Sequence, residues 1–359
     1  MIGNLRMHAR LFEPVQLGEI SLKNRIIMAP MTRDRAGGDD VPNAIMVEYY
    51  RQRASAGMIV TEGTQPSIEG KGYWRTPGIY SAAQIHGWRR VTDAVHGAGG
   101  CITLQIMHCG RVVVPANRGY AADIIAPSAI AMDGKVPGPD GVPVPTAMPR
   151  ALDADELPAL ADGFATAARN AIEAGFDAVE LHCASGYLIN QFLNPASNQR
   201  DDGYGGDAAR RATFPLMVLR AMAQAVGAGR VGFRISPGNP YNGMDVSDPW
   251  GDFAPFLQGA SALNLAYLHI VDMGDACPDT LGRVGALYDG ALVANNMLTA
   301  DSALARLSDQ VQAVSFGRAF IANPDLPVRI AGGHPLTKPD YGLLYTGEER
   351  GYCDYPPLK

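Results

Sequence analysis

The chain has 359 residues, of which 47% are hydrophobic and 18% are charged, so the composition excludes an intrinsically disordered protein. The formal net charge is −6 and there is no long basic run, which argues against nucleic acid or an anionic membrane as the main partner. The 5 cysteines lack the paired spacing of a disulfide framework, and no apolar run is suited to a signal peptide or a membrane helix. These features predict a cytoplasmic protein with free thiols.

Short runs rich in apolar and β-branched residues recur along the chain. They are almost continuously apolar, as parallel strands buried on both faces are. Eight such runs are found, at 25–29, 58–62, 101–105, 177–182, 231–236, 267–271, 291–294 and 311–316.

Helical segments alternate with these runs. Ser81 precedes Gln84 by three residues, which is the spacing of a capping box, and the apolar period that follows runs to Gly97. Further helices are predicted from Asp153 or Asp155 to Gly175, from Phe214 to Val226, and after a cap at Thr299.

Eight repeats of strand and helix predict an α/β fold, a (β/α)₈ TIM barrel, with an open doubly wound sheet as the alternative. Two connections, 107–150 and 237–251, exceed ordinary loop lengths. Because the first follows the third strand, we expect residues 107–150 to form a capping subdomain or lid inserted in a single domain that spans residues 1–359.

Polar side chains follow the ends of several predicted strands. In a barrel these ends converge on one pocket. Any one of these residues could be half of a buried ion pair or satisfy a strand end, whereas the whole set is richer than folding requires. The residues are Thr32, Glu62, Gly63, Gln105, His108, His182, Ser185, Tyr187, Arg234, Gly317 and Arg318.

Gly317 and Arg318 follow the last predicted strand. Backbone N–H groups beside a glycine, together with a guanidinium, predict a phosphate site, although a surface salt bridge would also explain Arg318. The seventh strand ends in Asn295, Asn296 and Met297, where glycines are expected beside a phosphate.

Two His-Cys pairs, His108 with Cys109 and His182 with Cys183, follow neighbouring strands. Two imidazoles and two thiolates are a possible zinc ligand set. This leaves a metal-dependent barrel hydrolase or lyase as an alternative function, although consecutive residues at a strand end point in different directions.

The chain resembles the Old Yellow Enzyme family of flavin-dependent ene-reductases over nearly its whole length. The matching stretches keep the family's order. They are 11–14, 24–33 (NRIIMAPMTR), 49–55 (YYRQRAS), 61–64 (TEGT), 77–80 (PGIY), 191–193, 198–200, 204–206, 316–318 (FGR), 323–326 (NPDL) and 351–356.

The resemblance implies non-covalent FMN, with NADPH or NADH as the reductant. In the family the Thr32 hydroxyl contacts the isoalloxazine, Gln105 binds its pyrimidine edge, and Arg234 lies beside N1 and the C2 carbonyl, where a cation favours the anionic reduced flavin. The full set of implied cofactor-binding residues is Ala29, Pro30, Met31, Thr32, Glu62, Gly63, Gln105, His182, Arg234, Asn296, Gly317 and Arg318.

The resemblance also implies a ping-pong reaction on a small molecule that carries an activated C=C bond. His182 and Ser185 would bind the substrate carbonyl, and Tyr187 would protonate the α-carbon after hydride transfer. Met107 and Tyr345 would line the substrate pocket. No metal is implied, and either a monomer or a homodimer is expected.

Three positions depart from the family pattern. Ser185 stands where Asn or His is usual, Met107 where Trp is usual, and Asn296 with Met297 where small residues are usual. Met107 and Ser185 suggest a specialised, bulky or biosynthetic substrate. A flavin-binding barrel with little turnover is the remaining alternative.

Overall fold

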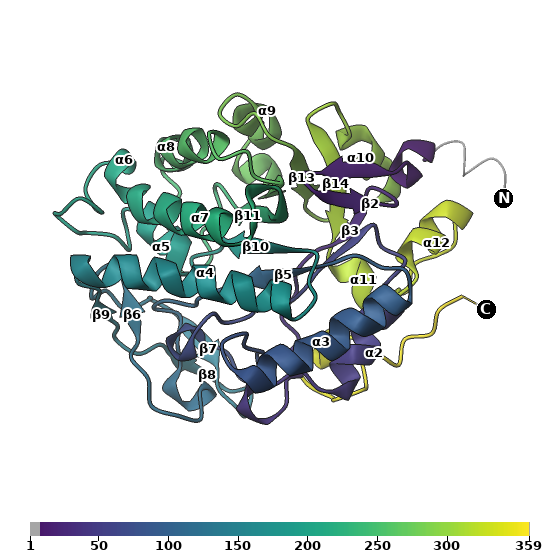
Figure 1. Cartoon of the computed structure of the whole chain (residues 1–359), viewed down its shortest axis with the longest axis horizontal. Helices are drawn as coiled ribbons and strands as arrows, with labels where there is room; N and C mark the ends of the chain where they lie inside the picture. Colours follow the sequence, from purple (N-terminus) through teal and green to yellow (C-terminus); the bar gives the residue numbers. More distant parts are fainter. Residues whose placement is uncertain (1–7, 359) are drawn as a thin grey trace.

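The computed structural model describes residues 8–358, and its centre is a closed barrel of parallel strands (Figure 1). Each predicted run forms one strand, so the predicted barrel is confirmed. The strands are β3 (Ile26–Met28), β4 (Met58–Val60), β5 (Ile102–Ile106), β10 (Ala178–His182), β11 (Val231–Ile235), β12 (Tyr267–Val271), β13 (Leu292–Asn295) and β14 (Val311–Phe316).

The barrel closes where the last strand pairs with the first. β14 lies parallel to β3, with Val314 opposite Ile26 and Phe316 opposite Met28. The N–H of Ala29 extends this pairing by donating to the carbonyl of Phe316 at 3.0 Å. An open doubly wound sheet leaves its edge strands unpaired, so that alternative is wrong.

Helices surround the barrel, and α4 and α7 pack side by side along one flank (Figure 1). The capping box of Ser81 with Gln84 and the cap at Thr299 are confirmed. The helices are α2 (Ala44–Gln52), α3 (Ala82–Gly97), α4 (Leu157–Glu173), α5 (Leu188–Leu193), α6 (Ala208–Arg211), α7 (Thr213–Val226), α8 (Pro249–Ser261), α9 (Thr280–Gly285), α10 (Ala300–Arg306), α11 (Arg318–Ala322) and α12 (Leu326–Gly332).

A hairpin that the sequence analysis missed covers the N-terminal end of the barrel. It consists of β1 (Val15–Leu17) and β2 (Ile20–Leu22), which pair antiparallel. Leu17, Ile20 and Leu22 pack against apolar side chains at the start of the barrel strands, so this end of the interior is filled. The residues that the hairpin covers are Ile27, Met58, Val60, Ala178, Ala266, Tyr267, Val293 and Ala313.

Residues 107–150 leave the barrel after β5 and form short strands of their own. β6 (Ile125–Ala126) pairs with β9 (Arg150–Ala151), and β7 (Lys135–Pro137) pairs with β8 (Pro143–Pro145). These strands lie together at the lower left in Figure 1. Their apolar side chains form a separate small core, in which Met107, Val113 and Val136 cluster with Tyr187.

Two buried arginines after β3 hold the C-terminal segment against the barrel. Arg33 donates to the carbonyls of Leu344 at 2.9 Å and Gly351 at 2.6 Å. Arg35 donates to the carbonyl of Leu343 at 2.9 Å. Backbone carbonyls of residues 343–351, together with the Tyr49 hydroxyl and the Arg33 carbonyl, therefore satisfy the donors of both guanidinium groups, as burial of such groups requires.

Asp34 lies between these arginines, and one of its carboxyl oxygens is buried without a hydrogen-bond partner. Burial and the nearby Glu62 carboxylate raise the pKa of Asp34 to about 8. The positive charges of Arg35, Arg75 and Arg33 lower this pKa, but by less. Glu62 is itself buried, and this raises its pKa to about 7. Asp34 is therefore protonated in the folded protein at neutral pH.

This predicts that Asp34→Asn stabilises the protein in alkaline solution. The unfolded state releases the Asp34 proton near its ordinary pKa of 3.8, whereas the folded state keeps it up to about 8. Stability therefore falls as the pH rises between these two values. An amide does not titrate, so the variant should gain about 2 kcal/mol near pH 9, after allowance for partial solvent screening, and very little near pH 4.5.

The measurement is urea unfolding of both proteins at the two pH values. Asp39→Asn, at an exposed neighbouring position, is the matched control. Its free energy of unfolding should depend on pH as that of wild type does. A gain in Asp34→Asn that is the same at both pH values would show that the Asp34 carboxyl does not titrate in this way.

Candidate active site

A cavity of about 170 Å³ opens at the C-terminal ends of the barrel strands. All of its lining residues except Tyr241 belong to the predicted site. The lining consists of Pro30, Thr32, Gly63, Gln105, Met107, His182, Ser185, Tyr187, Arg234 and Tyr241. The structure thus brings residues from distant parts of the chain to one rim, as parallel strands in a closed barrel require.

His182 is the last residue of β10 and lies opposite Arg234 of β11 in the strand register. The N–H of Ala184 donates to Nδ1 of His182 at 3.3 Å, so the ring proton must be on Nε2. Burial, with the Arg234 charge as a second cause, lowers the pKa of His182 to about 3. His182 is therefore a neutral imidazole that has one N–H available as a donor.

Tyr187 lies against His182, with ring centroids 5.1 Å apart and nearly edge to face. Its hydroxyl is 2.9 Å from the hydroxyl of Tyr73, a residue that the sequence analysis did not select. Burial raises the pKa of Tyr187 well above its ordinary value, and it does the same for Tyr73. Both phenols therefore keep their protons at neutral pH, as a proton donor must.

Ser185 follows β10 in a left-handed backbone conformation, with φ of +55°. Its N–H donates to the Ser236 hydroxyl at 2.9 Å, and its carbonyl accepts from the Asn242 side chain at 2.8 Å. The Asn239 amide also reaches the Ser185 hydroxyl, at 3.5 Å. The second long connection, 237–251, thus holds Ser185 from outside the barrel.

Gly186 explains how this connection comes so close. A Cβ atom at this position would lie 2.6 Å from Cβ of Asn242 and 2.7 Å from the carbonyl oxygen of Tyr241. Only glycine leaves room for the loop, and it also tolerates the φ of +74° found here. The same approach brings Tyr241 to the cavity wall.

Arg234 and Gln105 form the inner wall of the cavity. Arg234 donates to the side-chain oxygen of Asn295 at 2.8 Å, and Gln105 donates to Glu180 at 2.8 Å. Gly63 lies under Met107, because a Cβ on this glycine would meet the Met107 methyl carbon at 2.5 Å. The wall therefore presents a fixed cation and an amide beside an apolar thioether.

The predicted phosphate corner is where the first and last strands meet. Gly317 lies next to Met31, since a Cβ atom added to Gly317 would be 3.4 Å from the Met31 sulfur. Arg318 is exposed, and its guanidinium lies 3.8 Å from the sulfur of Met297. Asn296 and Met297 both have positive φ, 153° and 39°, where side chains other than glycine are strained.

Some predicted residues do not reach the cavity wall. Tyr345 is 59% exposed on the C-terminal segment. Glu62 is buried behind the wall, where it accepts hydrogen bonds from the Tyr50 hydroxyl at 3.1 Å and from the N–H of Arg33 at 3.3 Å. Ala29 is buried in the barrel closure. Their contacts with cofactor or substrate stay predictions.

The two His-Cys pairs do not form a metal centre. His108 accepts at Nδ1 from the N–H of Gly110 at 3.0 Å, as His182 does from Ala184. Burial raises the pKa of Cys109 to about 12, which disfavours a thiolate. Among residues 8–358, no group of three or more His, Cys, Asp or Glu side chains is arranged to hold a metal ion.

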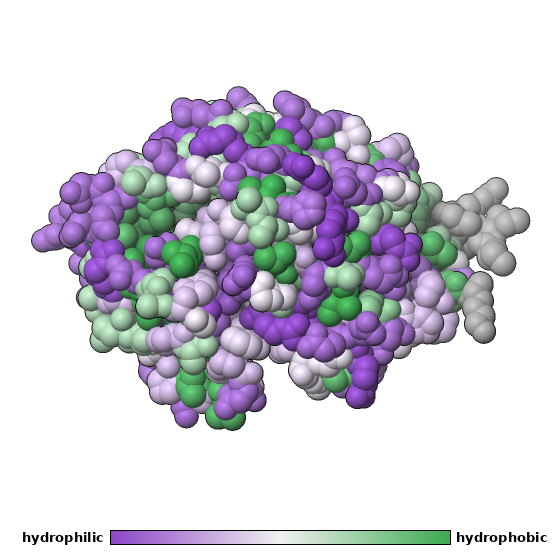
Figure 2. Space-filling view, turned by 60° about the horizontal axis from the view of Figure 1, so that its bottom comes forward, coloured by the Kyte–Doolittle hydropathy of each residue, from purple (hydrophilic) through white to green (hydrophobic). Residues whose placement is uncertain are grey.

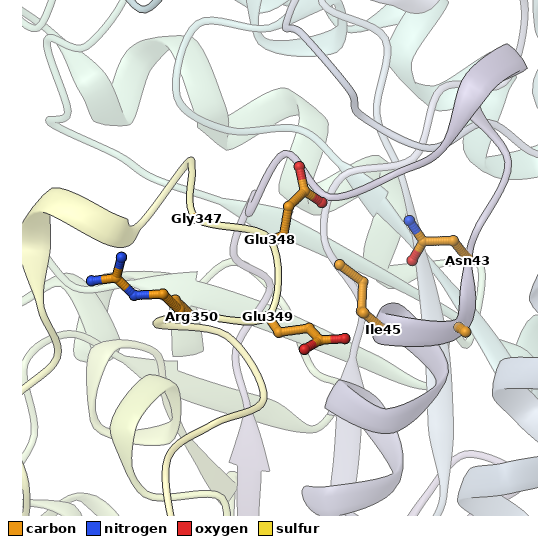
Figure 3. Close-up of a pocket in the computed structure, with 7 residues that line it drawn as sticks. Asn43, Ile45, Gly347, Glu348, Glu349 and Arg350 are labelled. Carbon is orange, nitrogen blue, oxygen red and sulfur yellow. The ribbon is translucent and has the colours of Figure 1, made fainter.

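A hollow larger than the strand-end cavity lies away from these residues. It has a volume of about 450 Å³ and lies between the start of α2 and residues 347–350, where Glu348 and Glu349 lie on the side of Asn43 and Arg350 points away (Figure 3). On the face in Figure 2, apolar residues lie in small scattered groups.

In the part of the chain described by the structure, no helix is long and apolar enough to cross a membrane.

The chain is similar to known flavin enzymes over almost its whole length. The family model described as "NADH:flavin oxidoreductase / NADH oxidase family" matches residues 10–337. A probable flavin mononucleotide-dependent alkene reductase of Leishmania infantum is 42% identical over 96% of this chain and 97% of its own length.

Two solved structures share the fold. The Old Yellow Enzyme homologue of Zymomonas mobilis is 41% identical, with a TM-score of 0.92 over 97% of this chain and 99% of its own. Morphinone reductase in complex with tetrahydroNAD is 43% identical, with a TM-score of 0.92 over 97% of this chain and 98% of its own. The chain therefore belongs to the NADH:flavin oxidoreductase/NADH oxidase family, and the predicted resemblance to Old Yellow Enzyme is confirmed.

Proposed function

We propose that this protein is an FMN-dependent ene-reductase that uses NADPH or NADH to reduce activated C=C bonds, as in α,β-unsaturated carbonyl compounds. The observation that carries the proposal is the composition of the cavity at the strand ends. Arg234 and Gln105 lie on its inner wall, and His182, Ser185 and Tyr187 line it as well. The Arg234 cation, which we propose contacts the cofactor, thus shares one cavity with the imidazole and hydroxyl donors that we propose contact the substrate.

The residues fit FMN chemically. The pyrimidine edge of an isoalloxazine offers one N–H donor and carbonyl acceptors, which match the amide of Gln105 and the guanidinium of Arg234. Thr32, Gly63, Pro30 and Met107 line the same cavity. Gly317, Arg318 and Asn296 are proposed to hold the phosphate, with Ala29, Met31 and Glu62 supporting the nearby backbone.

Bound FMN would accept hydride from the nicotinamide and supply it to the β-carbon of the alkene. The contribution of the protein at the substrate carbonyl comes from His182 and Ser185. The Nε2–H of His182 is fixed by the Ala184 contact, so it can donate without reorienting when charge develops on the carbonyl oxygen. Such a donor contributes roughly 10²–10³ in rate.

Tyr187 is the proposed acid for the α-carbon. Its phenol is buried and protonated, and it faces the same cavity as His182. Tyr73 is hydrogen-bonded to it at 2.9 Å. A second hydroxyl at this distance can orient the phenol and offset charge on its oxygen as the proton leaves.

Substrate selection is proposed to depend on Ser185, Met107 and the open mouth of the site. The serine hydroxyl is shorter than the asparagine or histidine usual here, and a methionine adapts more readily than a tryptophan. These two departures support a specialised substrate, a bulky or biosynthetic enone. Tyr345, on the exposed C-terminal segment, is proposed to contact such a substrate at the mouth.

We propose a single domain over residues 1–359, with residues 107–150 as its cap. The cap core includes Met107 and Tyr187, so the packing of the cap and the shape of the site are linked. A cytoplasmic location is supported by free cysteines at all five positions. A monomer or a homodimer is proposed, with a small molecule as partner and neither nucleic acid nor a membrane.

The direct test follows flavin colour through one catalytic cycle. The purified protein reconstituted with FMN should lose its absorbance near ~450 nm on addition of NADPH or NADH. The absorbance should then return under anaerobic conditions when an enone is added. Bleaching without recovery by any enone would leave a flavoprotein of little turnover, and the proposed reductase activity would be wrong.

Tyr187→Phe should slow the alkene half-reaction by about 10²–10⁴-fold, since it removes a general acid. Reduction of the flavin by NADPH should stay nearly unchanged, because that step needs no acid at this position. Stopped-flow absorbance measures the two half-reactions separately. Tyr288→Phe is the control. It removes a buried hydroxyl that lies outside the site and has no hydrogen-bond partner. Equal losses in both half-reactions would remove Tyr187 from this role.

Ser185→Asn should raise turnover of small enones such as cyclohexenone by about 2- to 10-fold, the value of one added hydrogen bond. Asparagine tolerates the φ of +55° at this position better than serine does, so thermal stability should not fall. Steady-state assays of a small and a bulky enone measure the change in preference. If wild type already reacts fastest with the small enone, the bulky-substrate hypothesis is wrong.

A further inference from the structure

A layer of polar side chains crosses the barrel interior directly beneath the cavity. It lies between the cavity wall and the apolar side chains that the hairpin β1–β2 covers. Its members come from five strands, one from each, and are nearly or completely buried. They are Gln105, Glu180, Arg234, His269 and Ser315, whose exposures run from 0% for Glu180 and His269 to 9% for Arg234.

Glu180 is the centre of this layer. One carboxylate oxygen accepts from Nε2 of Gln105 at 2.8 Å, and the other lies 2.8 Å from Nδ1 of His269. Nε2 of His269 in turn lies 2.7 Å from the hydroxyl of Ser315. If His269 is neutral, every proton in this row of hydrogen bonds has an acceptor, because His269 donates to Glu180 and Ser315 donates to His269.

We propose that Glu180, held by His269, is a positioning residue of the flavin site that fixes the Gln105 amide and sets the charge felt by the cofactor. Nothing in the barrel fold itself requires a carboxylate at this depth, where an apolar residue would avoid the cost of desolvation. The inference rests on the proposed function, because it assigns the layer a role toward FMN.

The first consequence concerns the direction of the Gln105 amide. An ionised carboxylate only accepts hydrogen bonds, so Gln105 must turn its NH₂ group toward Glu180. Its carbonyl oxygen is then left for the cavity that Gln105 lines. An acceptor there matches the N3–H group, which is the one N–H on the pyrimidine edge of an oxidised isoalloxazine.

The second consequence concerns charge. Burial alone would raise the pKa of Glu180, but His269, Arg234 and the Gln105 hydrogen bond outweigh it, so the pKa is lowered and the group is ionised. Burial and Arg234 lower the pKa of His269, which is therefore neutral. The neighbouring titratable groups are uncharged as well: His182 is neutral, and burial with the nearby Glu180 charge raises the pKa of Tyr267 and of Cys183 well above their ordinary values. Glu180 thus offsets the Arg234 cation, which would otherwise stabilise a reduced, anionic flavin more strongly.

Glu180→Gln tests the charge with little change in shape. The new amide can still accept from Gln105, and His269 can adopt its other tautomer. The variant should bind reduced FMN more tightly relative to oxidised FMN, by about 10-fold or more, which is an upward shift of about 30 mV in the two-electron midpoint potential. Glu173→Gln, at an exposed position of α4, is the control and should leave the potential unchanged.

A second measurement needs no variant and stands even if Glu180→Gln folds poorly. Wild-type apoprotein should bind 3-methyl-FMN at least about 10-fold more weakly than FMN, because a methyl group replaces the proton that Gln105 would accept. Equal affinity for the two flavins, or an unchanged potential in folded Glu180→Gln, would overturn this inference alone. Failure of the apoprotein to bind FMN at all would overturn the proposed function with it.

Discussion

The parallel pairing of β14 with β3 is the constraint on which the site depends. These strands lie almost 290 residues apart in the sequence, and their hydrogen bonds turn a twisted sheet into a closed barrel. Closure puts residues 29–32 beside Gly317 and Arg318, and it directs every strand end to one rim. In an open sheet these two segments would lie at opposite edges, and the cavity that joins Thr32, Gln105 and Arg234 would not exist.

Burial determines the protonation states within that rim. His182 is neutral because a buried imidazolium beside Arg234 is unfavourable, and the N–H of Ala184 fixes which nitrogen carries the proton. The Tyr187 phenol keeps its proton for the same reason. Arg234 and Glu180 are both charged in the barrel interior, and they offset each other. Donors that are fixed and shielded from water need little reorganisation when charge develops on a substrate.

The strands, the helix caps and most of the cavity wall could be predicted from the sequence, because each leaves a local pattern. A continuous apolar run indicates a buried strand, and Ser81 with Gln84 indicates the start of a helix. Tyr73, Tyr241 and Asn239 could not be predicted, since they reach the site from loops whose paths depend on tertiary contacts such as the approach to Gly186. The β1–β2 hairpin was missed because each of its strands has a polar residue between two apolar ones and so lacks the continuous apolar run that marks the barrel strands.

The most direct test of the account is a crystal structure of the protein reconstituted with FMN and soaked with a simple phenol. We predict that the pyrimidine edge of the flavin contacts Gln105 and Arg234, and that the phenolic oxygen lies within hydrogen-bond distance of Nε2 of His182 and the hydroxyl of Ser185. A flavin bound outside this cavity, or a phenol that makes no contact with His182, would contradict the assignment of this rim as the active site.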